Sequence, residues 1–371
     1  MNEDRFSGSP LSSPDLRMTR DEALNASHGR SRTPAAPTIS QDWHWDSALT
    51  DKADNGGSDM RSPKPWASFL LVFALFLSLE HAWLATAQTC GSTGLALQVL
   101  GSGGPELQDK RASTSYLIWE NGRARVLLDA GGGSALRFGE SGAQMSQVDI
   151  FLFSHFHVDH SGDFPALIFS SWFEDRNRPL PVYGPTGNNF MPSTTEFVHD
   201  LFADPRGAWR YLSDLVQPGV EGGYQLQPHN VAISPFPVLV FHNPHLALYA
   251  VSVTHGVFPA LGWRVEIGGK RIVFSGDTNG EGEGLTQLAS NADLFVAHNA
   301  VPEGATGLER RLHMPPSVIG AIAANAHVRQ LVLSHRMLRT LGKESETEAE
   351  IRLRYSGPIA FANDLDCFPV K

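Results

Sequence analysis

The stretch DIFLFSHFHVDH, residues 149–160, gives the strongest structural signal in this chain of 371 residues. An apolar run typical of a buried strand ends at Ser154, and four metal-capable side chains follow within six residues: His155, His157, Asp159 and His160. Neutral imidazoles and a carboxylate suit zinc and similar divalent ions. The stretch therefore predicts a buried strand with a metal site at its end.

Apolar, β-rich segments alternate with helical patterns on both sides of this stretch, which predicts an α/β fold. We expect helices at about 163–174 and 316–326, with Phe169, Trp172 and Phe173 of the first packing in the core. A stretch from 176 to 245, punctuated by Pro and Gly, is expected to shape the substrate cleft. The strands are predicted at 95–101, 114–120, 125–131, 247–255, 261–267, 271–277, 294–300 and 330–336.

Three of the later predicted strands end in a further metal-capable side chain. His255 closes SVTH, Asp277 closes FSGD and His335 closes LVLSH. A rigid sheet can fix side chains at strand ends while the following loops stay open to substrate. We therefore expect these residues to share one site with the histidines of residues 155–160.

The sequence resembles the metallo-β-lactamase superfamily from about residue 95 to 368, because HFHVDH matches the HxHxDH signature of that family. The resemblance implies a four-layer αβ/βα sandwich and two divalent metal ions, expected to be zinc, with a hydroxide between them as the nucleophile. By the same resemblance, one ion is held by His155, His157 and His255, the other by Asp159, His160 and His335, and Asp277 bridges the two.

The bridging aspartate narrows the branch of the family. Authentic β-lactamases lack it, so the chain looks closer to ribonuclease Z and the related arylsulfatase and phosphodiesterase group. The resemblance makes Asp159 and His313 the expected catalytic side chains, with His313 stabilising charge or protonating the leaving oxygen. A helix-entry histidine bonded to the backbone is the alternative for His313. One departure is AHNA, residues 297–300, where ribonuclease Z carries HEAT.

Two further assignments stay open between a functional and a structural role. Asp129, which precedes three glycines, is expected either to orient a ligand histidine or to be a plain turn residue. Arg336 and Arg339 either receive the anionic end of a sulfate or phosphate ester or are surface arginines.

The charge balance bears on the substrate. The formal net charge is −10, and a broad grip on nucleic acid normally needs clustered Lys and Arg. We therefore expect a small sulfate ester or phosphodiester as substrate and no nucleic-acid partner. The alternatives are a lactone or carboxylic ester, a ribonuclease Z-like endoribonuclease, and a non-catalytic binding module; a homodimer is left open.

The N-terminal third divides by composition. Residues 1–59 are polar and predict a disordered or mis-assigned extension, with Met60 as the true start. Residues 60–87 have the layout of a secretory signal peptide, with a membrane anchor as the alternative, and the catalytic domain is expected at 88–371. A periplasmic or secreted enzyme without stable membrane association would follow. In that compartment Cys90 and Cys367 either pair or remain two unrelated thiols.

Overall fold

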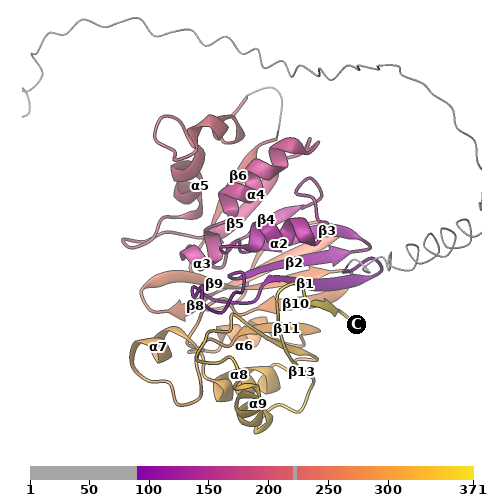
Figure 1. Ribbon diagram of the computed structural model, residues 1–371, viewed down its shortest axis with the longest axis vertical. Coiled ribbons are helices and arrows are strands. Elements are labelled where there is room, and N and C mark those ends of the chain that lie inside the picture. Colours follow the sequence, from indigo (N-terminus) through magenta and orange to yellow (C-terminus); the bar gives the residue numbers. More distant parts are fainter. Residues whose placement is uncertain (1–89, 220–223) are drawn as a thin grey trace, which may run out of the picture. The chain divides into compact units, whose positions relative to one another are not determined.

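The computed structural model describes residues 90–219 and 224–371. The expected extension and signal peptide lie outside these residues. The described chain forms two seven-stranded sheets that face each other, with helices on the outer side of each, as Figure 1 shows. This is the four-layer sandwich that the resemblance implied.

The first sheet has the strand order β14-β1-β2-β3-β4-β5-β6. Strands β3 to β6 run parallel to one another, whereas β1, β2 and β14 pair antiparallel. Parallel strands send their carboxyl ends to the same edge, which is where α/β folds host sites. The strands are β1 (Leu95–Gly101), β2 (Ser115–Glu120), β3 (Arg123–Leu128), β4 (Ile150–Leu152), β5 (Leu180–Pro185), β6 (Leu226–Val231) and β14 (Cys367–Pro369).

The second sheet has the order β13-β12-β11-β10-β9-β8-β7. A long hairpin joins β8 and β9 in full register, and β10 to β13 run parallel. The strands are β7 (Val238–His242), β8 (Leu246–His255), β9 (Phe258–Ile267), β10 (Lys270–Phe274), β11 (Leu294–His298), β12 (Leu331–Ser334) and β13 (Ile359–Phe361).

Three apolar clusters separate the four layers. The central cluster joins the inner faces of the two sheets, with Tyr116 and Leu152 from one and Trp263 from the other. The outer clusters pack helices against each sheet. The helices that cover the sheets are α2 (Ser134–Glu140), α4 (Phe164–Ser170) and α5 (Thr194–Phe202) on the first, and α6 (Gly284–Leu288), α8 (Pro316–Asn325) and α9 (Glu344–Arg352) on the second. Helix α7 (Gly307–Leu312) precedes α8. Because both sheets are covered on both faces, their strands read as nearly continuous apolar runs.

A disulfide joins Cys90 to Cys367, with 5.6 Å between the two Cα atoms. It links the start of the described chain to β14, which pairs with β1. The structure thus decides between the two alternatives for these cysteines in favour of pairing.

The region of the first predicted helix departs from expectation. Helix α4 ends at Ser170 and a short 3-10 helix, η1 (Ser171–Phe173), follows. Phe169, Trp172 and Phe173 are 41%, 51% and 77% exposed, so the prediction that they pack in the core was wrong. Their helical spacing correctly placed them on one face, but that face is turned to solvent. Within 90–219 and 224–371, none of the helices combines the length and the apolar character needed to cross a membrane.

Candidate metal centre

The predicted metal-capable residues converge where strands of both sheets end. His155, His157, Asp159 and His160 follow β4, the last two on the short helix α3 (Val158–Ser161). His255 is the last residue of β8, and Asp277 and His335 follow β10 and β12. All of the imidazoles except that of His157 are buried. The strand ends therefore bring together, from far apart in the sequence, the residues that the sequence pattern had singled out.

The first group consists of His155, His157, His255 and Asp277, whose ligand atoms all lie within 4.8 Å of one another. Nδ1 of His157 is 3.1 Å from Nε2 of His155 and 3.3 Å from Nε2 of His255. Oδ2 of Asp277 lies 3.6 Å from the same nitrogen of His255 and 3.9 Å from that of His155. Three nitrogens and one carboxylate oxygen thus surround one point.

The second group consists of Asp159, His160 and His335, which also lie around the carboxylate of Asp277. Oδ1 of Asp277 is 3.3 Å from Nε2 of His335, and its Oδ2 is 3.7 Å from Nε2 of His160. Asp159 faces the same two histidines, with Oδ2 at 3.3 Å from His335 and 3.7 Å from His160. Asp277 is therefore within reach of both sets of residues.

The buried nitrogens at the centre fit a bound cation. Nε2 of His160, Nδ1 of His313 and both ring nitrogens of His335 have no hydrogen-bond partner among the described residues. A buried polar atom without a partner costs about 1–3 kcal/mol. A cation placed between these imidazoles and carboxylates would satisfy several of them at once. Histidine nitrogens with carboxylate oxygens are a donor set that divalent metal ions accept.

The histidines of the site differ in the direction of their pKa shifts. Burial lowers the pKa of His155 well below its ordinary value and also lowers that of His157. Burial acts the same way on His335, but Asp277 and Asp159 outweigh it and raise the pKa of His335 to about 9. Burial would raise the pKa of Asp277, yet the neighbouring imidazoles of His335, His313 and His160 hold it well below its usual range.

Asp129 orients one of the predicted ligands. Its Oδ2 lies 2.9 Å from Nδ1 of His160 and accepts a hydrogen bond from the Ser154 hydroxyl at 2.7 Å, while Oδ1 accepts from the Ser154 backbone NH. The carboxylate is fully buried, and Asp129 adopts a left-handed backbone conformation with φ 59°. Such a contact fixes the tautomer and leaves Nε2 of His160 facing the centre. Of the two alternatives for Asp129, the orienting role is the one that the contacts support.

His298, the last residue of β11, was not among the residues predicted for the site. It lies within 4.8 Å of the ligand atoms of His160, Asp277 and His335. Both of its nitrogens are engaged, however: Nδ1 is 2.7 Å from Oδ1 of Asp277, and Nε2 is 3.0 Å from the Tyr116 hydroxyl. We therefore interpret His298 as the residue that positions Asp277. Its place at a strand end, shared with the other ligands, was the signal that could have identified it.

His313 lies at the mouth of the centre. Its Nδ1 is 3.9 Å from Oδ2 of Asp277, and its ring centroid is 5.4 Å from that of His255 and 5.6 Å from that of His335. It therefore faces members of both groups. Its backbone NH bonds to Glu309, but the side chain makes no backbone hydrogen bond among the described residues, contrary to the structural alternative for this histidine.

The two arginines after His335 have different surroundings. Arg336 is buried, pairs with Glu344 of α9 and lies over the ring of Phe361, so it is neither a surface residue nor directed at the centre. Arg339 lines a cavity together with His313. Its guanidinium donates to the Ala300 carbonyl at 2.6 Å and to Glu309 at 2.9 Å. Of these two arginines, Arg339 is the one that borders the same cavity as His313.

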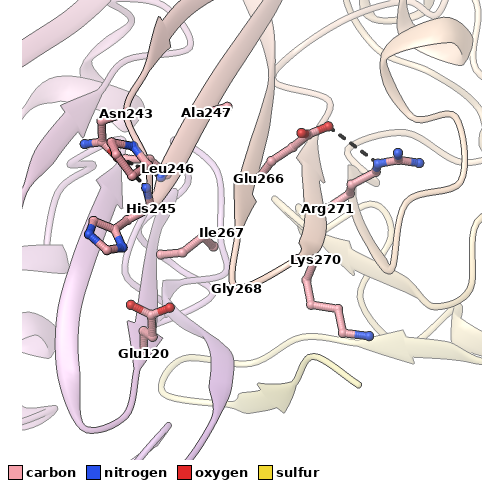
Figure 2. A pocket seen from close by; sticks show the side chains of 12 residues that line it. Glu120, Asn243, His245, Leu246, Ala247, Glu266, Ile267, Gly268, Lys270 and Arg271 are labelled. Atoms are coloured by element: carbon pink, nitrogen blue, oxygen red, sulfur yellow. Dashed lines mark hydrogen bonds and ion pairs between the residues drawn. The ribbon is translucent and has the colours of Figure 1, made fainter.

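A cavity of about 430 Å³ lies at the opposite end of β8 from His255. Figure 2 shows the side chains that line it. Its charged side chains are already paired, because Glu266 lies 3.5 Å from Arg271, Lys270 lies 3.5 Å from Asp293 and Glu120 bonds to Arg125. It therefore lacks the cluster of unpaired donors that marks the centre.

A family model matches the part of the chain that contains the centre. Residues 124–336, more than half of the chain, match the model described as the Beta-lactamase superfamily domain. The chain belongs to the β-lactamase superfamily. The matched region contains every residue of both groups in the centre.

Two relatives of this chain with similar sequences are both named ribonuclease Z. Ribonuclease Z of Mycobacterium bovis (strain BCG / Pasteur 1173P2) is 26% identical over 293 residues, covering 73% of this chain and 96% of the relative. Ribonuclease Z of Mycolicibacterium paratuberculosis (strain ATCC BAA-968 / K-10) is 28% identical over 292 residues, with 73% and 96% covered. The chain is therefore related to ribonuclease Z.

Solved structures share the fold at lower identity. The human short-form tRNase Z has a TM-score of 0.58 at 18% identity, covering 74% of this chain and 99% of that one. The metallo-β-lactamase fold protein YhfI of Bacillus subtilis has a TM-score of 0.57 at 19% identity, with 74% and 98% covered.

Together these findings identify a metallo-β-lactamase superfamily hydrolase with a site suited to divalent metal ions. Cleavage of a sulfate ester finds no support among the relatives. We expected no nucleic-acid partner, and relatives named ribonuclease Z speak against that expectation.

Proposed function

We propose that this protein is a dinuclear, zinc-dependent phosphodiesterase of the ribonuclease Z type. The observation that carries the proposal is the position of Asp277. Its carboxylate lies within 3.3–3.9 Å of Nε2 of four histidines, two from each group: His155, His255, His160 and His335. A carboxylate within reach of histidines of both groups could be shared by two ions, and a pair of ions suits in-line attack at phosphorus.

The reaction adds water across a P–O ester bond and yields a phosphomonoester and an alcohol. When bound, the two ions supply the Lewis acidity that activates the water and offsets phosphoryl charge. The chain's own residues set the geometry. Asp129 and His298 hold His160 and Asp277 in place, and Asp159 completes the second group because both nitrogens of His298 are already used.

His313 is proposed to contact the reacting phosphoryl group. It faces histidines of both groups, is 8% exposed, and its Nδ1 has no hydrogen-bond partner among the described residues. Burial lowers the pKa of His313 to about 3, so the neutral imidazole can stabilise negative charge on the phosphoryl group by donating a hydrogen bond. Arg339, which lines the same cavity, can approach a second phosphoryl oxygen.

RNA is the favoured substrate class, since the curated relatives share the name ribonuclease Z. A small phosphodiester remains the second candidate because the formal net charge of −10 disfavours a broad electrostatic grip on a polyanion. The two differ in salt dependence: binding of an RNA strand weakens steeply as salt rises, whereas turnover of a small diester changes little.

The test combines metal analysis with a substrate panel on residues 88–371. We expect two zinc ions per chain and turnover of bis(4-nitrophenyl) phosphate and of a 3′-extended precursor tRNA, with no release of sulfate from nitrophenyl sulfate. Asp277→Ala should lose both metal and turnover, whereas His313→Ala should keep the metal and lose more than tenfold in turnover. Hydrolysis of an aryl ester or lactone without phosphodiester turnover would contradict the proposal.

Export is proposed as well. A disulfide between Cys90 and Cys367 suits an oxidising compartment, and the segment at 60–87 precedes it directly. N-terminal sequencing of the protein isolated from its native host should find a mature chain that starts near Gln88. A chain that retains residues 60–87 and stays with the membrane fraction would favour the anchor instead.

A further inference from the structure

An uncharged groove borders the metal centre. It lies at the carboxyl ends of β5 and β6 and along the tip of the β8–β9 hairpin, with Thr186, Val231, Val253 and Phe258 among the residues that line it. None of the described residues that line it is charged, and its volume is about 260 Å³. The stretch 176–245, expected to shape the substrate cleft, thus supplies one wall of this groove.

Phe258 connects the groove to the centre. Its ring meets that of His157 edge to face, with the ring centroids 4.5 Å apart, and lies 6.1 Å from the ring of His255. The same phenylalanine lines the groove. A ligand held at the metal-binding histidines would therefore extend directly over Phe258 and into the groove.

The groove offers apolar contact and little polar recognition. Val257 and Ile233, which line it, are 56% and 69% exposed. The amide of Asn188 is already used: Nδ2 donates to the Val257 carbonyl at 2.8 Å, and Oδ1 accepts from the backbone NH groups of Phe190 and Met191. An apolar surface without a cation favours an uncharged ring and disfavours a second phosphate.

We propose that this groove is a subsite for one uncharged aromatic ring, carried as an organic substituent by the phosphoester whose phosphoryl group lies at the metal centre. The proposal rests on the proposed function and narrows its substrate class. The volume fits a single ring, because apolar cavities of about 150 Å³ already accept benzene. A nucleobase or an aryl group supplies such a ring. A bare phosphate or a methyl ester has no ring to place in the groove.

The test measures binding by calorimetry to the zinc-loaded protein, with phenylphosphonate and methylphosphonate as probes that are not hydrolysed. We expect phenylphosphonate to bind at least tenfold more tightly. Ile233→Asp and Val257→Asp change exposed side chains of the groove and should reduce that preference to less than threefold, and the neutral Ile233→Asn should reduce it as well. Leu353→Asp is the matched control, because Leu353 is 73% exposed and lines neither the groove nor the cavity of His313.

Equal binding of the two phosphonates to the wild-type protein would overturn the subsite. So would a preference that survives in both aspartate variants of the groove, or one that falls equally in Leu353→Asp. Turnover of bis(4-nitrophenyl) phosphate is measured on the same samples. A preserved aromatic preference without turnover would refute the phosphodiesterase but keep the subsite, and turnover without the preference would refute the subsite alone.

Discussion

Nδ1 of His298 lies 2.7 Å from Oδ1 of Asp277, and the hydroxyl of Tyr116 lies 3.0 Å from the other nitrogen of the same ring. Tyr116 is on β2 of the first sheet and His298 ends β11 of the second, so this chain of contacts crosses the central layer of the sandwich. The orientation of the central carboxylate is therefore tied to the packing of the two sheets.

His298→Ala should weaken metal binding, because Asp277 loses the partner that holds its carboxylate between the two groups. Loss of such a supporting contact typically costs about 10–100-fold in metal affinity or activity. Competition against a zinc chelator measures the affinity. Tyr116→Phe removes only the outer hydrogen bond and should cost less, and an effect in Tyr116→Phe larger than in His298→Ala would contradict this order.

Gly104→Ala should displace His335. A Cβ atom at position 104 would lie 2.8 Å from Cε1 and 3.1 Å from Nδ1 of that imidazole, closer than side chains normally approach. We expect loss of about one metal ion per chain with the fold retained, measured by elemental analysis and circular dichroism. Gly132→Ala is the control, since a Cβ there meets nothing within 4 Å; equal metal loss in both variants would argue against a local displacement.

The metal-free protein should be most stable near pH 6.5, the ordinary pKa of histidine. The folded state raises the pKa of His335 to about 9 against burial, chiefly through Asp277, so that stabilisation is full below about pH 6.5 and is lost as the pH rises toward 9. Burial lowers the pKa of His298 to about 4 and of His313 to about 3. The unfolded chain takes up these protons first, so stability also falls as the pH drops below about 6.5.

Thermal unfolding of chelator-treated protein between pH 5 and 9 measures this dependence. A midpoint temperature that rises steadily from pH 6.5 to 9 would contradict it. With zinc bound, the alkaline loss should disappear, because metal ions displace the same protons and bind more tightly as the pH rises.

Cys367→Ser should destabilise the domain by about 2–5 kcal/mol, the usual cost of removing a native disulfide. The bond spans 277 residues of sequence and ties β14 to the edge of the first sheet. Denaturant unfolding with and without reductant measures the loss. Metal content should stay unchanged, because neither cysteine belongs to the two groups of the centre; a parallel loss of metal would mean that the first sheet opens further than its edge.

The positions of the strand ends and of the candidate ligands could be predicted from the sequence. Each of four apolar runs is followed at its end by a metal-capable side chain, which indicates a strand that ends at the site. The first run leads into HFHVDH, and the others end at His255, Asp277 and His335. Strands that run in the same direction in one sheet end at a common edge, so the pattern predicted an α/β fold and a shared site for His255, Asp277 and His335. The four-layer sandwich came from the family resemblance, and the histidines after β4 join the site only because the other sheet packs against the first.

The tertiary structure decided what depends on contacts between distant segments. Helical spacing put Phe169, Trp172 and Phe173 on one face, but only the packing of other elements decides whether a face is covered, and this one is exposed. The role of Asp129 rests on its contact with His160, which follows the neighbouring strand of the same sheet. That of His298 rests on its contacts with Asp277 in its own sheet and with Tyr116 in the other. The uncharged groove joins the ends of β5 and β6 to the β8–β9 hairpin. Periodicity in a sequence records the direction of a side chain, whereas its partner is set by the folding of the remaining chain around it.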